Sequence, residues 1–182
     1  MKTFKLLTAA LCLLAMATNG LAQKDYSKSE GLLKYVDPFI GSGYHGHVFV
    51  GTSVPYGMVQ LGPSNIHKGW DWCSAYHYSD SILIGFSHTH LSGTGCADLG
   101  AILIMPLNEI RTPRGNQDNI SDGYATKYSH ANEVARPEYY SLLLDRYNIK
   151  AELTATDRVG FHRYTYPQGK PAVTHTTATY VK

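Results

Sequence analysis

The chain lacks several features that mark specialised classes of protein. Only 16% of its 182 residues are charged and no strict period runs through it, which excludes a disordered tail, a collagen-like repeat and a long coiled coil. No apolar run approaches the roughly 20 residues that a helix needs to span a bilayer. An excess of charge is also missing: 16 basic against 14 acidic residues become 16 − 2 = 14 against 14 without Lys2 and Lys5 of an expected leader. A neutral chain without a basic stripe argues against nucleic acid and anionic membranes as partners.

Residues 1–22 have the pattern of a secretory signal peptide. Lys2 and Lys5 precede an apolar run, and Gly20 and Ala22 place small residues at the −3 and −1 positions of a cleavage site. We therefore expect export, with the mature protein periplasmic or secreted. The next segment, residues 23–34, is polar and rich in Lys and Ser, and we expect it to be a flexible lead-in.

Cysteine is scarce, because only Cys73 and Cys96 remain once the leader with Cys12 is removed. Two cysteines do not make a disulfide framework, so the fold must depend on an ordinary core. In an oxidising compartment Cys73 and Cys96 can pair as a disulfide. The alternative is two small buried hydrophobic side chains.

Helical periodicity is nearly absent, apart from one expected turn near residues 132–135. The region from Tyr35 to Gly69 is rich in Gly and Pro, which demands turns, and alternation at Ile149–Ala155 predicts a strand with one wet face. The strands expected are residues 54–61, 81–86, 101–105, 139–144, 149–155 and 159–166. The last three are joined by short connections and predict an antiparallel meander. We predict an all-β fold, an antiparallel β-sandwich, with too few strands to be complete at its C-terminus.

Most side chains capable of chemistry lie between Asp37 and Asp98, including six of the nine histidines. The two H-x-H pairs, at 45–47 and 88–90, could each present two imidazoles to a transition metal, or the histidines could simply bond to loop backbone. The Trp70-Asp71-Trp72 run favours sugar recognition instead, because indole faces stack on sugar rings while a carboxylate accepts hydroxyl hydrogens; the alternative is that these rings belong to the core. A serine nucleophile is disfavoured because Ser92 lacks the nucleophile-elbow context.

Several runs resemble one known family. They are VDPFIG at residues 36–41, HGH at 45–47, VPYGMVQL at 54–61, WDWC at 70–73, GFSHTHLSGTGC at 85–96, AELTAT at 151–156 and GFHRY at 160–164. This set is similar to the opening of glycoside hydrolase family 92, whose members are exported, calcium-dependent, inverting exo-α-mannosidases. The resemblance covers roughly residues 35–166, which we assign to the family's N-terminal β-sandwich domain. Residues 167–182 depart from the pattern and are expected to be a divergent or truncated tail.

The resemblance implies that sugar contact and catalysis involve different domains. The catalytic acid and base and the main calcium ligands of the family belong to a C-terminal (α/α)6 barrel, so we expect no catalytic residue, no bound metal and no glycosidase activity in this chain alone. The residues expected to contact a mannose-containing glycan are Trp70, Asp71 and Trp72. Weaker candidates are His88, His90, Gly41 and Gly43. Asp71 and Asp98 are the only carboxylates near the aromatic run, and we do not expect them to form a catalytic pair.

Alternative functions remain open at this point. The chain could be a non-catalytic carbohydrate-binding or structural module derived from such an enzyme, and the nucleotide sequence after Lys182 would discriminate this case. It could also belong to an enzyme that cleaves the amide bond of N-glycans, which the product released from a glycopeptide would reveal. A metal-dependent β-sandwich enzyme is the remaining alternative, tested by metal analysis.

Overall fold

The structure is a computed structural model that describes residues 30–97 and 100–178. The predicted signal peptide, residues 23–29 of the predicted lead-in, and Asp98 lie outside the described residues. The short helix α2 (Glu30–Leu33) belongs to an N-terminal unit that ends at Tyr35, and the two-sheet fold belongs to a second unit that begins at Val36. In the described ranges no helix combines the length and apolar character required to cross a membrane.

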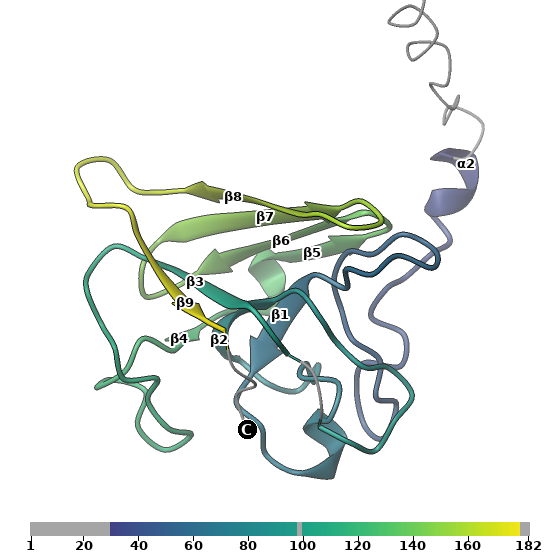
Figure 1. The fold of residues 1–182 in the computed structure, drawn as a ribbon, viewed down its shortest axis with the longest axis horizontal. Helices are drawn as coiled ribbons and strands as arrows, with labels where there is room; N and C mark the ends of the chain where they lie inside the picture. The colour runs from purple at the N-terminus through teal and green to yellow at the C-terminus, as the bar shows by residue number, and fades with distance from the viewer. Residues whose placement is uncertain (1–29, 98–99, 179–182) are drawn as a thin grey trace, which may run out of the picture. The chain divides into compact units, whose positions relative to one another are not determined.

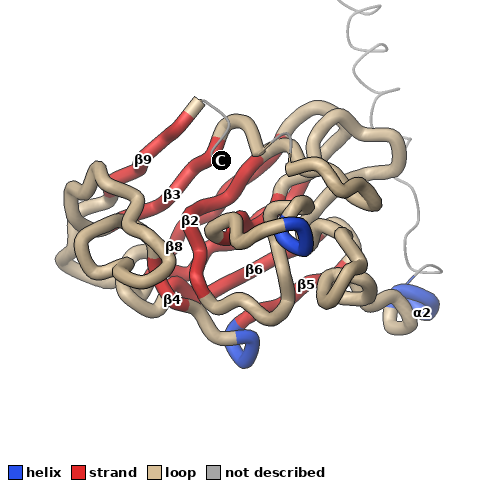
Figure 2. The backbone as a smooth tube through the Cα atoms, turned by 90° about the horizontal axis from the view of Figure 1, so that it is seen from below, coloured by secondary structure: helices blue, strands red, loops and turns tan. Residues whose placement is uncertain are grey.

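Two antiparallel sheets form two layers (Figure 1). One contains β1 (Gly62–Asn65), β2 (Ile82–Ser87), β3 (Leu103–Leu107) and β9 (Val173–Thr177) in that order, with β4 (Thr126–Lys127) also paired to β2. The other contains β5 (Glu133–Arg136), β6 (Tyr139–Leu144), β7 (Ile149–Ala155) and β8 (Gly160–Thr165) in sequence order. Long loops and the 3₁₀ turns η2 (Trp70–Trp72) and η3 (His130–Asn132) connect these strands (Figure 2). The predicted all-β sandwich is confirmed.

The core lies between the two layers. Phe86 of β2 contacts Tyr140 of β6 and Tyr164 of β8, with ring centroids 6.4 and 6.3 Å apart. Fully buried aliphatic side chains from both sheets surround these rings, among them Leu83, Met105, Leu142 and Ile149. Burying one such side chain contributes roughly 1.5–3 kcal/mol, so an ordinary hydrophobic core holds the layers together without a disulfide.

The meander predicted over residues 139–166 is present, with β6 and β7 at the predicted bounds. In β7 the side chains of Ile149, Ala151 and Leu153 face the core, whereas Lys150 and Thr154 are exposed. This is the alternation that the sequence predicted. Pairing in register, Glu152 with Arg163 and Thr154 with Phe161, places those side chains together on the outer face of the sheet.

The strand predicted over residues 54–61 is wrong. Val54 to Gly57 form a turn, closed by a hydrogen bond of 2.9 Å from the Gly57 amide to the Val54 carbonyl, with Tyr56 at φ 63°. The strand begins at Gly62, where a Cβ would lie 2.2 Å from the Val50 carbonyl oxygen, so only glycine permits the close approach. Pro63 is tolerated in β1 because β1 is the edge of its sheet.

The segment after residue 166, expected to be divergent, carries strand β9. Val173 to Thr177 pair along the whole of β3, from Leu107 to Leu103. Successive side chains of β9 alternate only between half-buried and exposed. This weak alternation explains why its Thr-rich sequence gave no strand signal. The helical turn expected near residues 132–135 lies slightly earlier, as η3, and Glu133 already begins β5.

Candidate functional site

Three loops that are distant in sequence meet beside β1 and β2. The Tyr78 amide donates to the Ser42 carbonyl at 2.9 Å, and the Gly93 amide donates to the His47 carbonyl at 2.7 Å. These bonds bring together the residue 41–49 loop, the residue 66–80 loop and the residue 88–97 loop. The Gly41 to Gly43 turn, the H-G-H run and the Trp-Asp-Trp run predicted from sequence therefore belong to one region.

A cavity of about 440 Å³ opens between the first two of these loops. Its lining residues are Gly43, Tyr44, His45, Asp71, Trp72, His77, Tyr78 and Ser79. The Trp72 indole stacks on the His77 imidazole with ring centroids 4.3 Å apart. The lining combines aromatic surface with a carboxylate and imidazoles, which is the mixture of apolar faces and polar groups expected of a small-molecule site.

Asp71 is held as an ionised acceptor at the cavity wall. Its Oδ1 lies 2.5 Å from His45 Nδ1 and 3.7 Å from His47 Nε2. The hydrogen bond from His45 lowers the pKa of the Asp71 carboxyl below its usual value. His47 is buried, and among the described residues its Nε2 has no hydrogen-bond partner, so Asp71 is the group nearest to satisfying it.

Trp70 lies outside the cavity but remains accessible, with 57% of its surface exposed. Its ring meets the edge of His47 at a centroid distance of 4.1 Å. The residue 88–97 loop passes closely over it, because a Cβ at Gly95 would lie 2.5 Å from the indole nitrogen. Neither indole is therefore sealed in the core: Trp72 faces the cavity and Trp70 faces solvent.

Asp80 anchors this region from beneath and was not predicted from the sequence. It is buried, and its Oδ2 accepts hydrogen bonds of 2.8 Å from both the Trp72 indole N–H and the Lys68 ammonium. Its Oδ1 accepts from the backbone amides of Ser81 and Ile82. Asp80 thus fixes the plane of Trp72 to the start of β2. A carboxylate eight residues after a Trp carries no sequence signal of this role.

A second support lies behind Tyr78. The His130 imidazole stacks on the Tyr78 ring at 4.3 Å and is hydrogen-bonded through Nδ1 to the buried Glu133 carboxylate. Glu133 also accepts hydrogen bonds from the hydroxyls of Tyr76 and Tyr140. This network belongs to the core, and it orients the aromatic wall of the cavity.

Two of the weaker candidates, His88 and His90, do not line the cavity. His90 is buried between Gln60, whose carbonyl lies 2.8 Å from Nδ1, and the Ser64 hydroxyl. His88 Nε2 lies 3.1 Å from His162 Nε2 of the opposite sheet. Burial lowers the pKa of both His90 and His162 to about 4, so both imidazoles are neutral structural groups at pH 7.

The remaining candidates divide between the cavity and its supports. Gly43 lines the cavity, whereas Gly41 shapes the turn: its φ of 83° favours glycine, and its carbonyl accepts from the Val48 amide. Of the two alternatives left open by the sequence, the disulfide is not present, since Cys73 and Cys96 are both free. Cys73 is buried with its thiol donating to the Thr94 carbonyl at 2.7 Å, and Cys96 is exposed.

The described residues do not fit a metal site. Within residues 30–97 and 100–178, no three His, Cys, Asp or Glu side chains are grouped so that they could hold an ion. Calcium takes six to eight oxygen ligands, whereas Asp71, the one carboxylate that lines the cavity, is already bonded to an imidazole. The H-x-H metal hypothesis therefore gains no support from the described residues.

Comparison with known proteins gives a family. The model of the glycosyl hydrolase family 92 N-terminal domain matches residues 35–180. The chain belongs to glycoside hydrolase family 92. The match extends past residue 166, where the resemblance noted from sequence ended, and includes β9.

Solved structures of this family share the fold. The family 92 α-mannosidase of Bacteroides thetaiotaomicron, solved in complex with mannoimidazole, is 39% identical with a TM-score of 0.78 over 82% of this chain. An inverting family 92 mannosidase of Bacteroides thetaiotaomicron VPI-5482 is 25% identical with a TM-score of 0.62 over 79% of this chain. An uncharacterised secreted glycosidase of Arthroderma benhamiae is 28% identical over 144 residues, 75% of this chain. The matched part spans 20%, 19% and 17% of these three proteins respectively.

Proposed function

We propose that this chain is the N-terminal, glycan-contacting part of an exported, calcium-dependent, inverting α-mannosidase that acts on mannose-containing N-glycans. In this proposal the chain forms one wall of the sugar site. A C-terminal (α/α)6 barrel outside these 182 residues supplies the catalytic acid, the catalytic base and the calcium ligands. Export is supported by the signal-peptide pattern of residues 1–22.

The observation that carries the proposal is the combination of Trp72 and Asp71 on one cavity wall. A sugar ring has an apolar C–H face and a rim of hydroxyl groups. An indole fixed in its plane by Asp80 provides a rigid surface for the first. A carboxylate kept ionised by His45 provides an acceptor for the second.

The same geometry argues that bond cleavage occurs elsewhere. An inverting glycosidase needs two carboxyl groups about 6.5–9.5 Å apart, one protonated and one ionised. Among the described residues, Asp71 alone contributes a carboxylate to the cavity lining, and its imidazole partner disfavours the protonated form. Asp71 is therefore suited to binding a hydroxyl and unsuited to protonating a leaving group.

The experiment is to measure binding and turnover on the same purified chain. Methyl α-mannoside is titrated by calorimetry, and release of nitrophenol from 4-nitrophenyl α-mannoside is followed over a day. We expect saturable binding that weakens in Asp71→Asn, with no release above the rate without protein. Absence of binding would refute the sugar-site assignment, and enzyme-dependent release would refute the location of catalysis outside the chain.

A further inference from the structure

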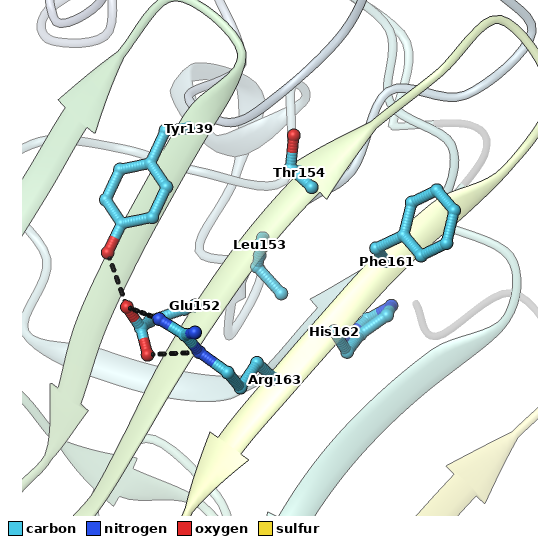
Figure 3. A pocket seen from close by; sticks show the side chains of 7 residues that line it. All are labelled: Tyr139, Glu152, Leu153, Thr154, Phe161, His162 and Arg163. Atoms are coloured by element: carbon cyan, nitrogen blue, oxygen red, sulfur yellow. Dashed lines mark hydrogen bonds and ion pairs between the residues drawn. The ribbon is translucent and has the colours of Figure 1, made fainter.

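A groove of about 280 Å³ lies on the outer face of the four-stranded sheet, far in sequence from the cavity at Trp72. Figure 3 shows Tyr139 and Phe161 on either side of it, with Thr154 between them and the Glu152–Arg163 pair at one end. Tyr139 and Phe161 stand two strands apart, on β6 and β8, which separates them by roughly 9.5 Å.

Phe161 provides a free aromatic face. It is 53% exposed although it lies within a strand, and no other ring or cation in the described part of the chain stacks on it. Tyr139 differs, because the Arg136 guanidinium covers its ring at 4.8 Å. The groove therefore offers one free aromatic face, that of Phe161. The ring of Tyr139, on the opposite side of the groove, is already covered by Arg136.

The polar groups of the groove are held rigid. The Arg163 Nε and Nη2 donate to the two oxygens of Glu152 at 2.8 and 2.7 Å, and the Tyr139 hydroxyl donates to Oε1 at 2.8 Å. These bonds, led by those from Arg163, lower the pKa of Glu152 to about 2, so the pair stays ionised at neutral pH. A planar guanidinium fixed in this way loses little conformational freedom when it binds a ligand.

Both hydrogen-bond donors and acceptors remain unused in the groove. Arg163 has five N–H groups and spends two on Glu152, and its side chain is 73% exposed. The Thr154 hydroxyl donates to the Glu138 carbonyl at 2.6 Å, which leaves its oxygen able to accept. Donors and acceptors beside an apolar platform match a hydroxyl-bearing ring with one C–H face.

We propose that this groove is a second sugar-binding site, which holds one hexose ring of a neutral glycan on Phe161 with its hydroxyls bonded to Arg163 and Thr154. Its volume lies near the lower end of ligand sites, which limits it to about one ring. An anion would have to compete with the Glu152 carboxylate, which already pairs with both Arg163 and Lys150. A peptide strand would pair with an edge, whereas the groove lies on a sheet face. Only the choice of mannose as the sugar rests on the function proposed above.

The test is a titration of the ¹⁵N-labelled 182-residue chain with α-1,2-mannobiose, followed by amide chemical shifts. We expect the amides of residues 152–154 and 161–163 to move saturably. Phe161→Ala should weaken this titration about tenfold, as loss of an aromatic contact does, while Phe161→Trp should retain it. Ile110→Ala removes an apolar side chain that is 86% exposed elsewhere and serves as the matched control, with no expected change.

The two sugar sites can fail separately. Asp71→Asn should weaken shifts at the cavity, residues 43–45 and 71–79, and leave those at residues 152–154 and 161–163 unchanged. Shifts confined to the cavity would overturn the second site and leave the proposed function standing. Shifts at the groove that persist in Phe161→Ala would also overturn it. So would groove shifts that depend on protein concentration and not on sugar, since these would identify the face as a protein contact.

Discussion

Replacing Asp80 by Asn tests how the cavity wall is held in place. The substitution keeps the size of the side chain and the oxygen that accepts from the Ser81 and Ile82 amides. In place of Oδ2 the variant carries an NH₂ group, which faces two other donors. These are the Trp72 indole N–H and the Lys68 ammonium, each 2.8 Å from Oδ2 in the parent protein. Both donors lose their acceptor, and the indole N–H of the half-buried Trp72 has no second acceptor among the described residues.

The magnitude follows from these two bonds. A hydrogen bond to a charged group contributes about 1.5–3 kcal/mol. The Lys68 side chain is 20% exposed, so water replaces part of its loss. We expect Asp80→Asn to lower the free energy of unfolding by about 3 kcal/mol, out of the 5–15 kcal/mol typical of a domain. With a urea m-value of about 2 kcal/mol/M, the midpoint should fall by roughly 1.5 M.

The assay is urea unfolding followed by tryptophan fluorescence, which also reports on the indole itself. Trp72 should become more mobile and more hydrated, so the native emission maximum should move to longer wavelength. Asp118→Asn, at an exposed loop position, is the matched control and should stay within about 0.5 kcal/mol of the parent. If Asp80→Asn behaved like that control, with unchanged native emission, Asp80 would not anchor the cavity wall.

Three further outcomes are expected. Burial holds the pKa of His90 at about 4 against about 6.5 when unfolded, so the unfolded state binds the extra proton. His90 should therefore lower the free energy of unfolding by up to about 3 kcal/mol as pH drops from 6.5 towards 4, in addition to the fall that His162 causes in the same pH range. A His90→Gln variant that kept the same pH dependence would contradict this. Gly160→Ala places a Cβ 2.9 Å from His88 Cδ2 and should cost about 1–3 kcal/mol by thermal unfolding; an unchanged transition would refute the crowding. Ellman's reagent should label exposed Cys96 in the native chain and buried Cys73, whose thiol pKa burial raises, only after unfolding, and equal labelling rates would be inconsistent with the structure.

The fold could be predicted where hydrophobic alternation is strong. The β6 to β8 meander followed from the alternation of Ile149, Ala151 and Leu153 with polar neighbours. The strand β1 could not be predicted, because its Gly62-Pro63 start has low strand propensity and is strand only through contact with Val50 and β2. Such pairings are set by tertiary contacts and leave no local pattern.

The candidate site, like the fold, could be predicted from the sequence only in part. Clustered Trp and Asp residues in a Gly-rich region predicted the location of the cavity. Sequence ranked Asp71, which lines the cavity, above His90 because of the flanking tryptophans, but it could not show that His90 is buried among core groups, since that depends on tertiary contacts. Asp80 was missed because its role depends on Lys68 and Trp72 converging on one oxygen, and no spacing rule describes that.

The central claim is that this chain holds a sugar and leaves cleavage to residues beyond it. The most direct measurement is the pair of indole N–H resonances of Trp70 and Trp72 during titration with α-1,2-mannobiose, with free mannose assayed in the same tube. The account predicts a saturable shift of the Trp72 resonance and no mannose release. An unmoved Trp72 resonance at saturating sugar, or mannose appearing in proportion to the protein, would contradict it.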